Sequence, residues 1–401
     1  MHILHVTPTY YPVRGGIETL VQRTSETLAV WGHEVTILTS DFTSVSGYYQ
    51  LGVPQINPKR EKLNGVNIIR LSFGNWLYIY LSHIVSILPS QKFRNLIEFY
   101  VLKVCYQRFF NLLEKQIDFL RPDVVMATPH LLPNVRAVVA AHQKNNFPLV
   151  LMPCLHEEAA DWSINEMIQV LKEADRVLAM TRYEALRLST VYGVEESRIN
   201  IGGFGVDIPD TYSDEKTLRE SNVLFLGRKV PGKGIPFLLE AMQIVWEKAP
   251  HIKLILAGAK SPETQVINRL LGGLPGEFQG KIASFDDISE DEKSKLLRSS
   301  LCLVLPSKIE SFGGVIIEAW AHKTAIITLD LPVFSSFVDK GLDGLLVSPD
   351  NVSELAHAIL QLEHDHEQAR ELGLAGYEKV VSQFSWEQIA HQYLITYDAI
   401  V

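Results

Sequence analysis

The sequence predicts an α/β protein with two doubly wound parallel sheets in tandem. Segments typical of strands and of helices alternate along the whole chain, which is the order that parallel sheets need. The predicted strands are short, continuous apolar runs, as expected for parallel strands buried on both faces. The chain has 401 residues, whereas a single hydrophobic core stops growing near roughly 250–300 residues. We therefore expect two domains.

The first series of elements begins at the N-terminus. Residues 2–6 predict a strand, a glycine-containing loop follows at 7–16, and an amphipathic helical pattern covers 17–31. The first apolar run is too short for a signal peptide and is broken by Pro8, so we interpret it as the first strand of a fold. Further strands are expected at 35–39, 66–71, 124–127, 149–152 and 176–180, with helices around 131–143, 165–173 and 183–192.

The second series begins after residues 202–214, which are rich in Gly, Pro and Asp and have the composition of a linker. In open α/β sheets, ligands bind outside the carboxyl ends of the strands. Two such sheets facing each other would form a deep cleft, and we expect the ligands there. Strands are expected at 223–226, 253–257, 282–285, 301–305 and 325–328, with helices near 235–248, 263–271, 291–299, 315–321 and 353–363.

The composition argues against several classes of protein. A net charge of −9 and a pI near 5.8 disfavour a nucleic-acid-binding surface, which usually carries a basic footprint. The three cysteines are far apart and lack metal-ligand spacing, which favours a reducing compartment. No apolar run reaches the roughly 18–20 residues of a membrane span. We expect a cytoplasmic protein.

Residues 73–119 break the alternating pattern. They carry many aromatic and large apolar side chains, with lysines and arginines between them. One interpretation is the core-facing surface of helices. The other is an amphipathic surface that contacts the inner face of a membrane, or a lipid-linked or hydrophobic acceptor, through its aromatic and basic residues.

Two glutamates bracket a glycine turn in the second series. Glu310 follows the predicted strand at 301–305, and Glu318 falls about a turn into the next helix. The backbone N–H groups of Gly313, Gly314 and Val315 then lie at a helix N-terminus, where free donors and the helix dipole favour an anion such as a phosphate. The alternative is a solvated loop acid followed by an ordinary acid of a first helical turn.

A basic glycine loop follows the strand at 223–226. Arg228 offers a planar fork of donors and Lys233 a mobile point charge, a suitable pair for two adjacent phosphates. The loop is not a P-loop, because no Ser or Thr follows a Gly-Lys pair at the required spacing. An exposed turn with solvated basic residues is the alternative.

Two loops of the first series point to the same cleft. Gly15 and Gly16 let the backbone approach a ligand closely, or form a plain connecting turn, and Glu18 follows in the first turn of a helix. His156 lies just beyond the strand at 149–152, where both a functional and a structural role are open.

In this order, the motifs resemble the retaining GT-B glycosyltransferases of family 4, the group-1 glycosyl transferases, over essentially the whole chain. The resemblance implies two Rossmann-like domains that face each other across a deep cleft. Residues 1–205 would bind the acceptor, residues 206–384 would bind the nucleotide-sugar, and a helix at about 385–401 would pack back on the first domain. The matching motifs are Gly15-Gly16-Ile17-Glu18, His156, Gly205-Val206-Asp207, the loop with Arg228 and Lys233-Gly234, and Glu310 with Glu318.

The resemblance also implies a role for each motif. His156 and Glu310 would be the catalytic residues at the donor sugar, and Glu318 would bind the ribose. No cofactor and no metal are expected, since Asp286-Asp287 is more typical of a turn than of a D-x-D metal motif. Retention would follow from a front-face substitution in which the leaving phosphate takes the proton. The donor diphosphate would be bound by Gly16, Arg228, Lys233, Gly313, Gly314 and Val315.

We therefore expect a hexosyltransferase that uses a nucleoside-diphosphate sugar and a sugar, lipid-linked or small-molecule acceptor, in polysaccharide, glycolipid or glycoconjugate synthesis. Two alternatives stay open, namely a GT-B nucleotide-sugar epimerase and a non-catalytic nucleotide-sugar binder. An NAD-dependent oxidoreductase is disfavoured because the first loop lacks G-x-G-x-x-G. The sequence departs from the family at 321–325, where the usual glycine and proline are absent, and at Ser311, which replaces a frequent glycine.

Overall fold

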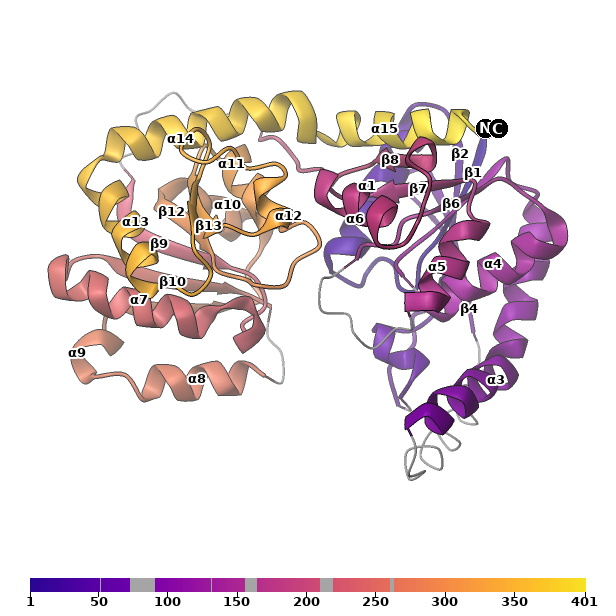
Figure 1. Ribbon diagram of the computed structural model, residues 1–401, viewed down its shortest axis with the longest axis horizontal. Coiled ribbons are helices and arrows are strands. Elements are labelled where there is room, and N and C mark those ends of the chain that lie inside the picture. The colour runs from indigo at the N-terminus through magenta and orange to yellow at the C-terminus, as the bar shows by residue number, and fades with distance from the viewer. Residues whose placement is uncertain (51, 73–90, 131, 156–163, 210–218, 260–262) are drawn as a thin grey trace.

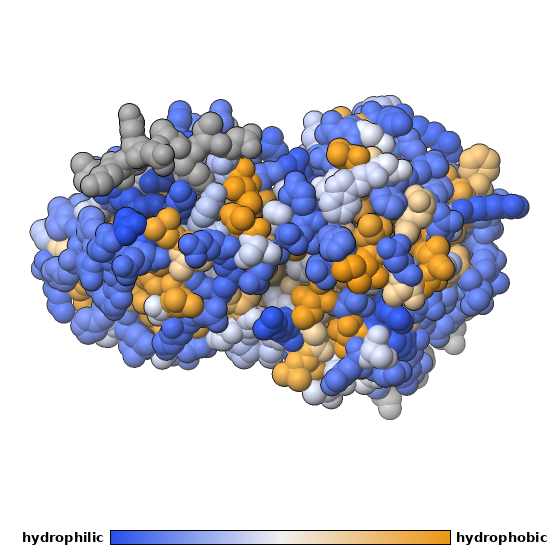
Figure 2. Space-filling model, turned by 90° about the horizontal axis from the view of Figure 1, so that it is seen from above, coloured by the Kyte–Doolittle hydropathy of each residue, from blue (hydrophilic) through white to orange (hydrophobic). Residues whose placement is uncertain are grey.

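The computed structural model describes residues 1–50, 52–72, 91–130, 132–155, 164–209, 219–259 and 263–401, with the backbone alone for 91–105. These residues form two lobes, each built on its own sheet, and a long helical segment runs across both (Figure 1). Seen from above, an indentation separates the lobes, and hydrophilic residues cover most of this face (Figure 2). Within the described residues, no helix is both long and apolar enough to span a bilayer.

The N-terminal lobe contains an eight-stranded sheet in the order β3-β4-β2-β1-β5-β6-β7-β8. Only β3 runs antiparallel to its neighbour among the described strands of this sheet. Every residue of the central strands β5 and β6 is buried, as their apolar runs predict. The strands are β1 (His2–Val6), β2 (Glu34–Ser40), β3 (Arg60–Leu63), β4 (Val66–Leu71), β5 (Val124–Ala127), β6 (Leu149–Leu151), β7 (Arg176–Ala179) and β8 (Ile199–Ile201), and the helices are α1 (Gly16–Val30), α3 (Gln91–Leu120), α4 (Pro133–Asn145), α5 (Ile164–Glu173) and α6 (Arg182–Thr190).

The C-terminal lobe contains a six-stranded parallel sheet in the order β11-β10-β9-β12-β13-β14. The strands are β9 (Glu220–Leu226), β10 (Lys253–Gly258), β11 (Ile282–Asp286), β12 (Ser300–Leu305), β13 (Ala325–Leu329) and β14 (Leu345–Val347). Its helices are α7 (Ile235–Lys248), α8 (Thr264–Gly272), α9 (Gly276–Gln279), α10 (Glu290–Ser299), α11 (Gly314–Ala321), α12 (Pro332–Ser335), α13 (Val352–His364) and α14 (His366–Lys379). A last helix, α15 (Trp386–Asp398), follows.

In each sheet the order of the strands reverses at the first strand of the doubly wound series: the next strands along the chain lie on one side of it, and later strands lie on the other side. β1 lies between β2 and β5, and β9 lies between β10 and β12. Such a switch point opens a crevice at the carboxyl ends of the strands, where doubly wound sheets bind their ligands. The loop after β1 ends at Gly15, directly before Gly16 begins α1. The loop after β9 carries Lys233, and the loop after β12 carries Glu310. The topology therefore places these predicted site residues at the two crevices.

The last helix returns to the N-terminal lobe. α15 packs on α1, β7 and β8, and it lies over that lobe in yellow in Figure 1. The Tyr397 hydroxyl lies 2.8 Å from Nε2 of His5, and Nδ1 of His5 lies 2.7 Å from the Ser25 hydroxyl. A parallel bridge joins Val206 to Ser385, so the two crossings between the lobes run side by side. The N-terminal core therefore depends on the C-terminal end of the described chain.

The structure confirms the predicted α/β class, and each strand and helix in the two predicted series is present. β1, β4, β5 and α7 have the predicted ends, and the other elements differ from the prediction by up to three residues at an end. The short strands β3, β8 and β14 and the helix α14 were not predicted. The segment at 73–119 contributes most of α3, in which Tyr106, Phe109, Leu113 and Ile117 are buried at helical spacing, as expected for a core-facing surface. Residues 73–90 lie outside the described part of the chain, so the membrane contact stays a prediction.

Candidate functional site

The glycine turn after β12 is shaped by backbone geometry. Gly313 has φ 88° and caps α11, and a Cβ there would lie 2.8 Å from the ring of Phe334. Other residues rarely adopt this conformation, and no side chain fits in this space. The N–H groups of Gly314 and Val315 belong to the first helical turn, where no intrahelical carbonyl can accept them. The turn thus presents backbone donors at the positive end of a helix, as an anion site requires.

Lys233 and Glu310 form an ion pair beside this turn. Nζ of Lys233 lies 2.6 Å from Oε1 of Glu310, and their side chains are 21% and 13% exposed. Lys233 ends a short 3-10 turn, and Gly234 with φ 78° then begins α7. A Cβ on Gly234 would lie 1.9 Å from the carbonyl oxygen of Pro306, at the end of β12. This close backbone contact brings the loop after β9 against the start of the loop after β12, which carries Glu310.

The two neighbouring cations of the loop after β9 have different surroundings. Arg228 is exposed, as a phosphate ligand should be. Lys229 is 1% exposed, and its Nζ donates to the hydroxyl of Ser284 at 3.0 Å, to the carbonyl of Phe285 at 3.2 Å and to the carboxylate of Asp286. Lys229 therefore ties the loop to the carboxyl end of β11.

Glu318, the predicted ribose ligand, lies within a cluster of charges. Nζ of Lys293, on α10, lies 2.9 Å from Oε1 of Glu318 and 2.6 Å from Oε2 of Glu290. Burial lowers the pKa of Lys293, but the charges of Glu318 and Glu290 outweigh it and raise the pKa above its ordinary value. Burial raises the pKa of Glu318, while the charge of Lys293 and its hydrogen bond act in the other direction. The charged lysine therefore favours the carboxylate form, which is an acceptor of hydroxyl hydrogen bonds.

Phe204, in the crossing between the lobes, lies close to both glycine loops. A Cβ on Gly16 would lie 4.0 Å from its ring, and one on Gly314 would lie 3.3 Å from it. The ring also stacks on Phe312 at 5.8 Å between centroids. The structure therefore brings the predicted diphosphate-binding glycines of the two lobes to opposite sides of one aromatic ring.

A small pocket, open to solvent, lies between the two lobes. Glu310 contributes to it from the C-terminal lobe, and the carboxyl ends of β6 and β7 contribute from the N-terminal lobe. His156, the residue after Leu155, lies outside the described residues. The pocket is lined by Leu155, Thr181, Tyr183, Glu184, Arg187, Glu310, Ser311 and Val333.

The segment Gly205-Val206-Asp207 forms part of the crossing. The N–H of Val206 donates to the carbonyl of Phe384 at 2.9 Å, and the carboxylate of Asp207 pairs with Arg23 of α1. These contacts tie the crossing to α1 and to the segment that precedes α15. Among the side chains that the structure describes, no group of three or more His, Cys, Asp or Glu is arranged to hold a metal ion.

Comparison with known families assigns the chain. Residues 14–208 match the family model described as Glycosyltransferase Family 4, and residues 212–379 match the model described as Glycosyl transferases group 1. The chain belongs to the GT-B glycosyltransferases of family 4. Together the two matches extend over the sheets of both lobes, apart from β1.

Curated relatives of this family-4 chain match it over part of their length. Alpha-maltose-1-phosphate synthase of Mycolicibacterium smegmatis is 29% identical over 251 residues, which are 57% of this chain and 64% of the relative. D-inositol 3-phosphate glycosyltransferase of Nocardia farcinica is 27% identical over 244 residues, which are 58% of this chain and 54% of the relative. The chain thus spans less than two thirds of the length of these relatives.

Solved structures share the GT-B fold over the whole family-4 chain. Sucrose-phosphate synthase from Thermosynechococcus elongatus has a TM-score of 0.76 at 21% identity, covering 100% of this chain and 99% of that one. HepE of Anabaena in complex with UDP has a TM-score of 0.70 at 16% identity, covering 100% of both chains. At such identities the likeness shows the fold.

Three features of this family-4 site were missed by sequence reasoning. Lys293 and Lys229 pair with acids 25 and 57 positions away, so no local motif indicates them. Phe204 lies within the predicted linker, where an aromatic residue among glycines was a signal that could have been noticed. All three add contacts around the predicted residues rather than replacing them.

Proposed function

We propose that this protein is a retaining, metal-independent glycosyltransferase that moves a hexosyl unit from a nucleoside-diphosphate sugar to an acceptor hydroxyl. The observation that carries the proposal is the position of Glu310. It pairs with Lys233 next to the glycine turn and also lines the pocket between the lobes. A donor with its diphosphate at the turn would therefore have its sugar at the pocket, facing the N-terminal lobe.

The leaving group is the centre of the proposed chemistry. The acceptor oxygen forms a bond to the anomeric carbon, the bond from that carbon to the diphosphate oxygen breaks, and the acceptor proton passes to the departing phosphate. Negative charge grows on the diphosphate in this step, where Lys233, Arg228 and the N–H groups of the turn would stabilise it. Glu310 and His156 would bind the sugar, and Glu318 would bind the ribose hydroxyls.

The acceptor would enter from the N-terminal lobe, in polysaccharide, glycolipid or glycoconjugate synthesis. The names of two curated relatives refer to maltose 1-phosphate and to inositol 3-phosphate. The first name gives a product and the second an acceptor, and this chain spans only part of those proteins. The names therefore suggest only that phosphorylated sugars and inositols be screened first as acceptors. Solved relatives in complex with UDP and with UDP-glucose place UDP-glucose first among the donors to test.

A thermal-shift panel of UDP-, GDP-, ADP- and TDP-sugars tests the donor site. One nucleotide class should raise the melting temperature of the wild type, and Lys233→Ala and Glu318→Ala should lose most of that rise. Lys340→Ala and Glu354→Ala are matched controls, because both residues make polar contacts in the same lobe but belong to none of the loops that carry the proposed site. Equal shifts in all five proteins would contradict the site assignment.

Product analysis then separates transfer from the two alternatives. A transferase releases the nucleoside diphosphate in proportion to glycosylated acceptor, with the anomeric configuration of the donor retained. An epimerase would return a nucleotide-sugar of altered configuration without release of the nucleotide. A protein that binds the donor but converts it with none of a broad set of acceptors would be a binder.

A further inference from the structure

The segment Pro153-Cys154-Leu155 leads from β6 to the pocket between the lobes, and its backbone is strongly bent. Cys154 has φ 53° and is 2% exposed. A residue other than glycine keeps this left-handed conformation only where surrounding contacts enforce it, and such residues gather at functional sites. Leu155, which follows the bend, lines the pocket together with Glu310.

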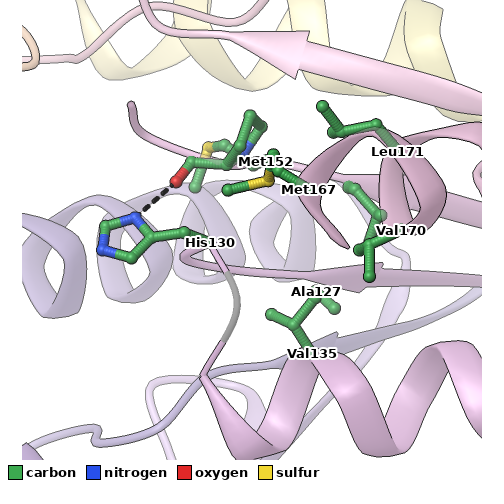
Figure 3. Close-up of a pocket in the computed structure, with 9 residues that line it drawn as sticks. Ala127, His130, Val135, Met152, Met167, Val170 and Leu171 are labelled. Carbon is green, nitrogen blue, oxygen red and sulfur yellow. Dashed lines mark hydrogen bonds between the residues drawn. The ribbon is translucent and has the colours of Figure 1, made fainter. Parts of the chain in front are cut away.

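His130, beyond the end of β5, holds the start of this segment. Its backbone N–H and its Nδ1 each lie 2.8 Å from the carbonyl oxygen of Pro153. Figure 3 shows the His130 ring turned toward that oxygen, with the dashed line marking the contact. Since the carbonyl can only accept, the ring nitrogen is the donor, and this assigns the proton to Nδ1.

Glu184, on the first turn of α6, holds the other end. Its Oε1 accepts from the N–H of Leu155 at 2.6 Å, and its Oε2 accepts from the N–H of Met180 at 2.6 Å. Thr181 fixes the same turn, because its hydroxyl accepts from the N–H of Glu184 at 3.0 Å. Glu184 is only 4% exposed, so solvent hardly reaches its carboxylate. Both of its oxygens accept from backbone N–H groups instead.

We infer that Glu184 and His130 are positioning residues for the proposed transfer. Together they clamp the bend at Cys154 from the segments that follow β5 and β7, the strands on either side of β6, and they fix the position of Leu155 in the lining of the sugar pocket. Neither residue is assigned a contact with the substrate. This inference rests on the proposed function, because the transferred sugar is what the clamped segment would face.

The clamp lies in the N-terminal lobe, whereas Lys233, Arg228 and Glu318 lie in the C-terminal lobe. Loss of the clamp should therefore impair transfer more than donor binding. A misplacement of about 1 Å at a reacting centre can slow a reaction about a hundredfold. We expect Glu184→Gln, which keeps the shape but replaces one acceptor by a donor, to lower kcat at least about tenfold with the donor KM within about twofold.

Three variants and one control test the inference. His130→Ala should lower kcat, and His130→Asn should restore much of it, because the Asn amide places a donor near the position of Nδ1. Glu354→Gln is the control for Glu184→Gln. Glu354 lies in the first turn of α13, and its carboxylate accepts from the backbone N–H of Ser348 at 3.0 Å. It is not among the residues that line the pocket.

Hydrogen–deuterium exchange of the ligand-free protein gives a readout that needs no activity. The peptide containing the Leu155 amide should exchange about tenfold faster in Glu184→Gln than in wild type and in Glu354→Gln. Unchanged exchange in a folded Glu184→Gln, or equal losses of kcat and of nucleotide affinity, would overturn the inference. A wild type that transfers no sugar contradicts the proposed function instead, and the exchange data still decide whether the clamp exists.

Discussion

Lys233 and Glu310 neutralise each other at the edge of the cleft, with 2.6 Å between Nζ and Oε1. A diphosphate that binds Lys233 must share or replace this partner. The ion pair would thus keep the lysine in place before a donor binds, and the bound donor would free Glu310 to accept hydrogen bonds from the sugar. The Lys233–Glu310 ion pair would thus prepare the site for both the diphosphate and the sugar of the proposed donor.

Substitution of either partner should separate these two effects. Lys233→Ala should weaken nucleotide binding by about 1.5–3 kcal/mol, the size of a hydrogen bond to a charged group. Glu310→Gln removes the competing charge, so the nucleoside diphosphate alone should bind at least as tightly as in wild type, while sugar transfer falls. Titration calorimetry with the diphosphate and with the full donor measures both, and weaker diphosphate binding by Glu310→Gln would contradict this account.

Gly234→Ala should destabilise the protein by about 2–4 kcal/mol, because the new Cβ would collide with the backbone of Pro306 at a left-handed position. Gly232→Ala is a control two positions earlier, since a Cβ there meets nothing within 4 Å. Its effect should stay within about 0.5 kcal/mol. Urea denaturation of both variants measures the difference, and similar midpoints would show that the loop relaxes freely.

Glu184 should make the protein less stable as the pH rises. Burial raises its pKa to about 7 from the ordinary 4.5, although its backbone hydrogen bonds and Arg187 act in the other direction. The folded protein therefore binds the proton more tightly than the unfolded chain does. The contribution of Glu184 to the free energy of unfolding is greatest below pH 4.5 and decreases as the pH rises through about 7. Glu184→Gln should remove this decrease from urea midpoints measured between pH 4.5 and 8.

His5 should have the opposite effect. Burial lowers its pKa from 6.5 to about 3, so the folded protein keeps the imidazole neutral while the unfolded chain takes up a proton below pH 6.5. The free energy of unfolding should therefore decrease as the pH falls from 6.5 toward 3. His5→Gln should flatten this part of the curve. The exposed His391 on α15 gives the control variant, His391→Gln, which should keep the wild-type slope.

Removal of divalent cations should leave transfer unchanged within about twofold, because side chains and helix N–H groups would meet the charge on the leaving diphosphate. Initial rates with and without EDTA measure this. A loss of transfer rate with EDTA that added Mg²⁺ or Mn²⁺ reverses would show that a metal ion, and not only Lys233 and Arg228, stabilises the charge on the leaving diphosphate.

Local sequence was sufficient for much of the fold and for the core of the candidate site. The strand before Glu310, the glycine turn and the helix with Glu318 form one continuous pattern, so their order could be predicted without tertiary information. β3 could not, because its residues Arg60–Leu63 include three charged side chains and no apolar run. The contacts from Lys229, Lys293 and Glu184 also could not be predicted, since each joins segments that only the folded sheets bring together.

The bond between His5 and Tyr397 has a consequence for synthesis. It joins residues 392 positions apart, and Tyr393 likewise places its hydroxyl 2.9 Å from the sulfur of Met152. Domains usually fold as they leave the ribosome, the N-terminal one first. Here the lobe that is translated first is the last to be completed, because α15 has not yet been made. Until then the nascent N-terminal lobe exposes the apolar surface that α15 will cover, and such transiently exposed surface is what makes folding intermediates prone to aggregation.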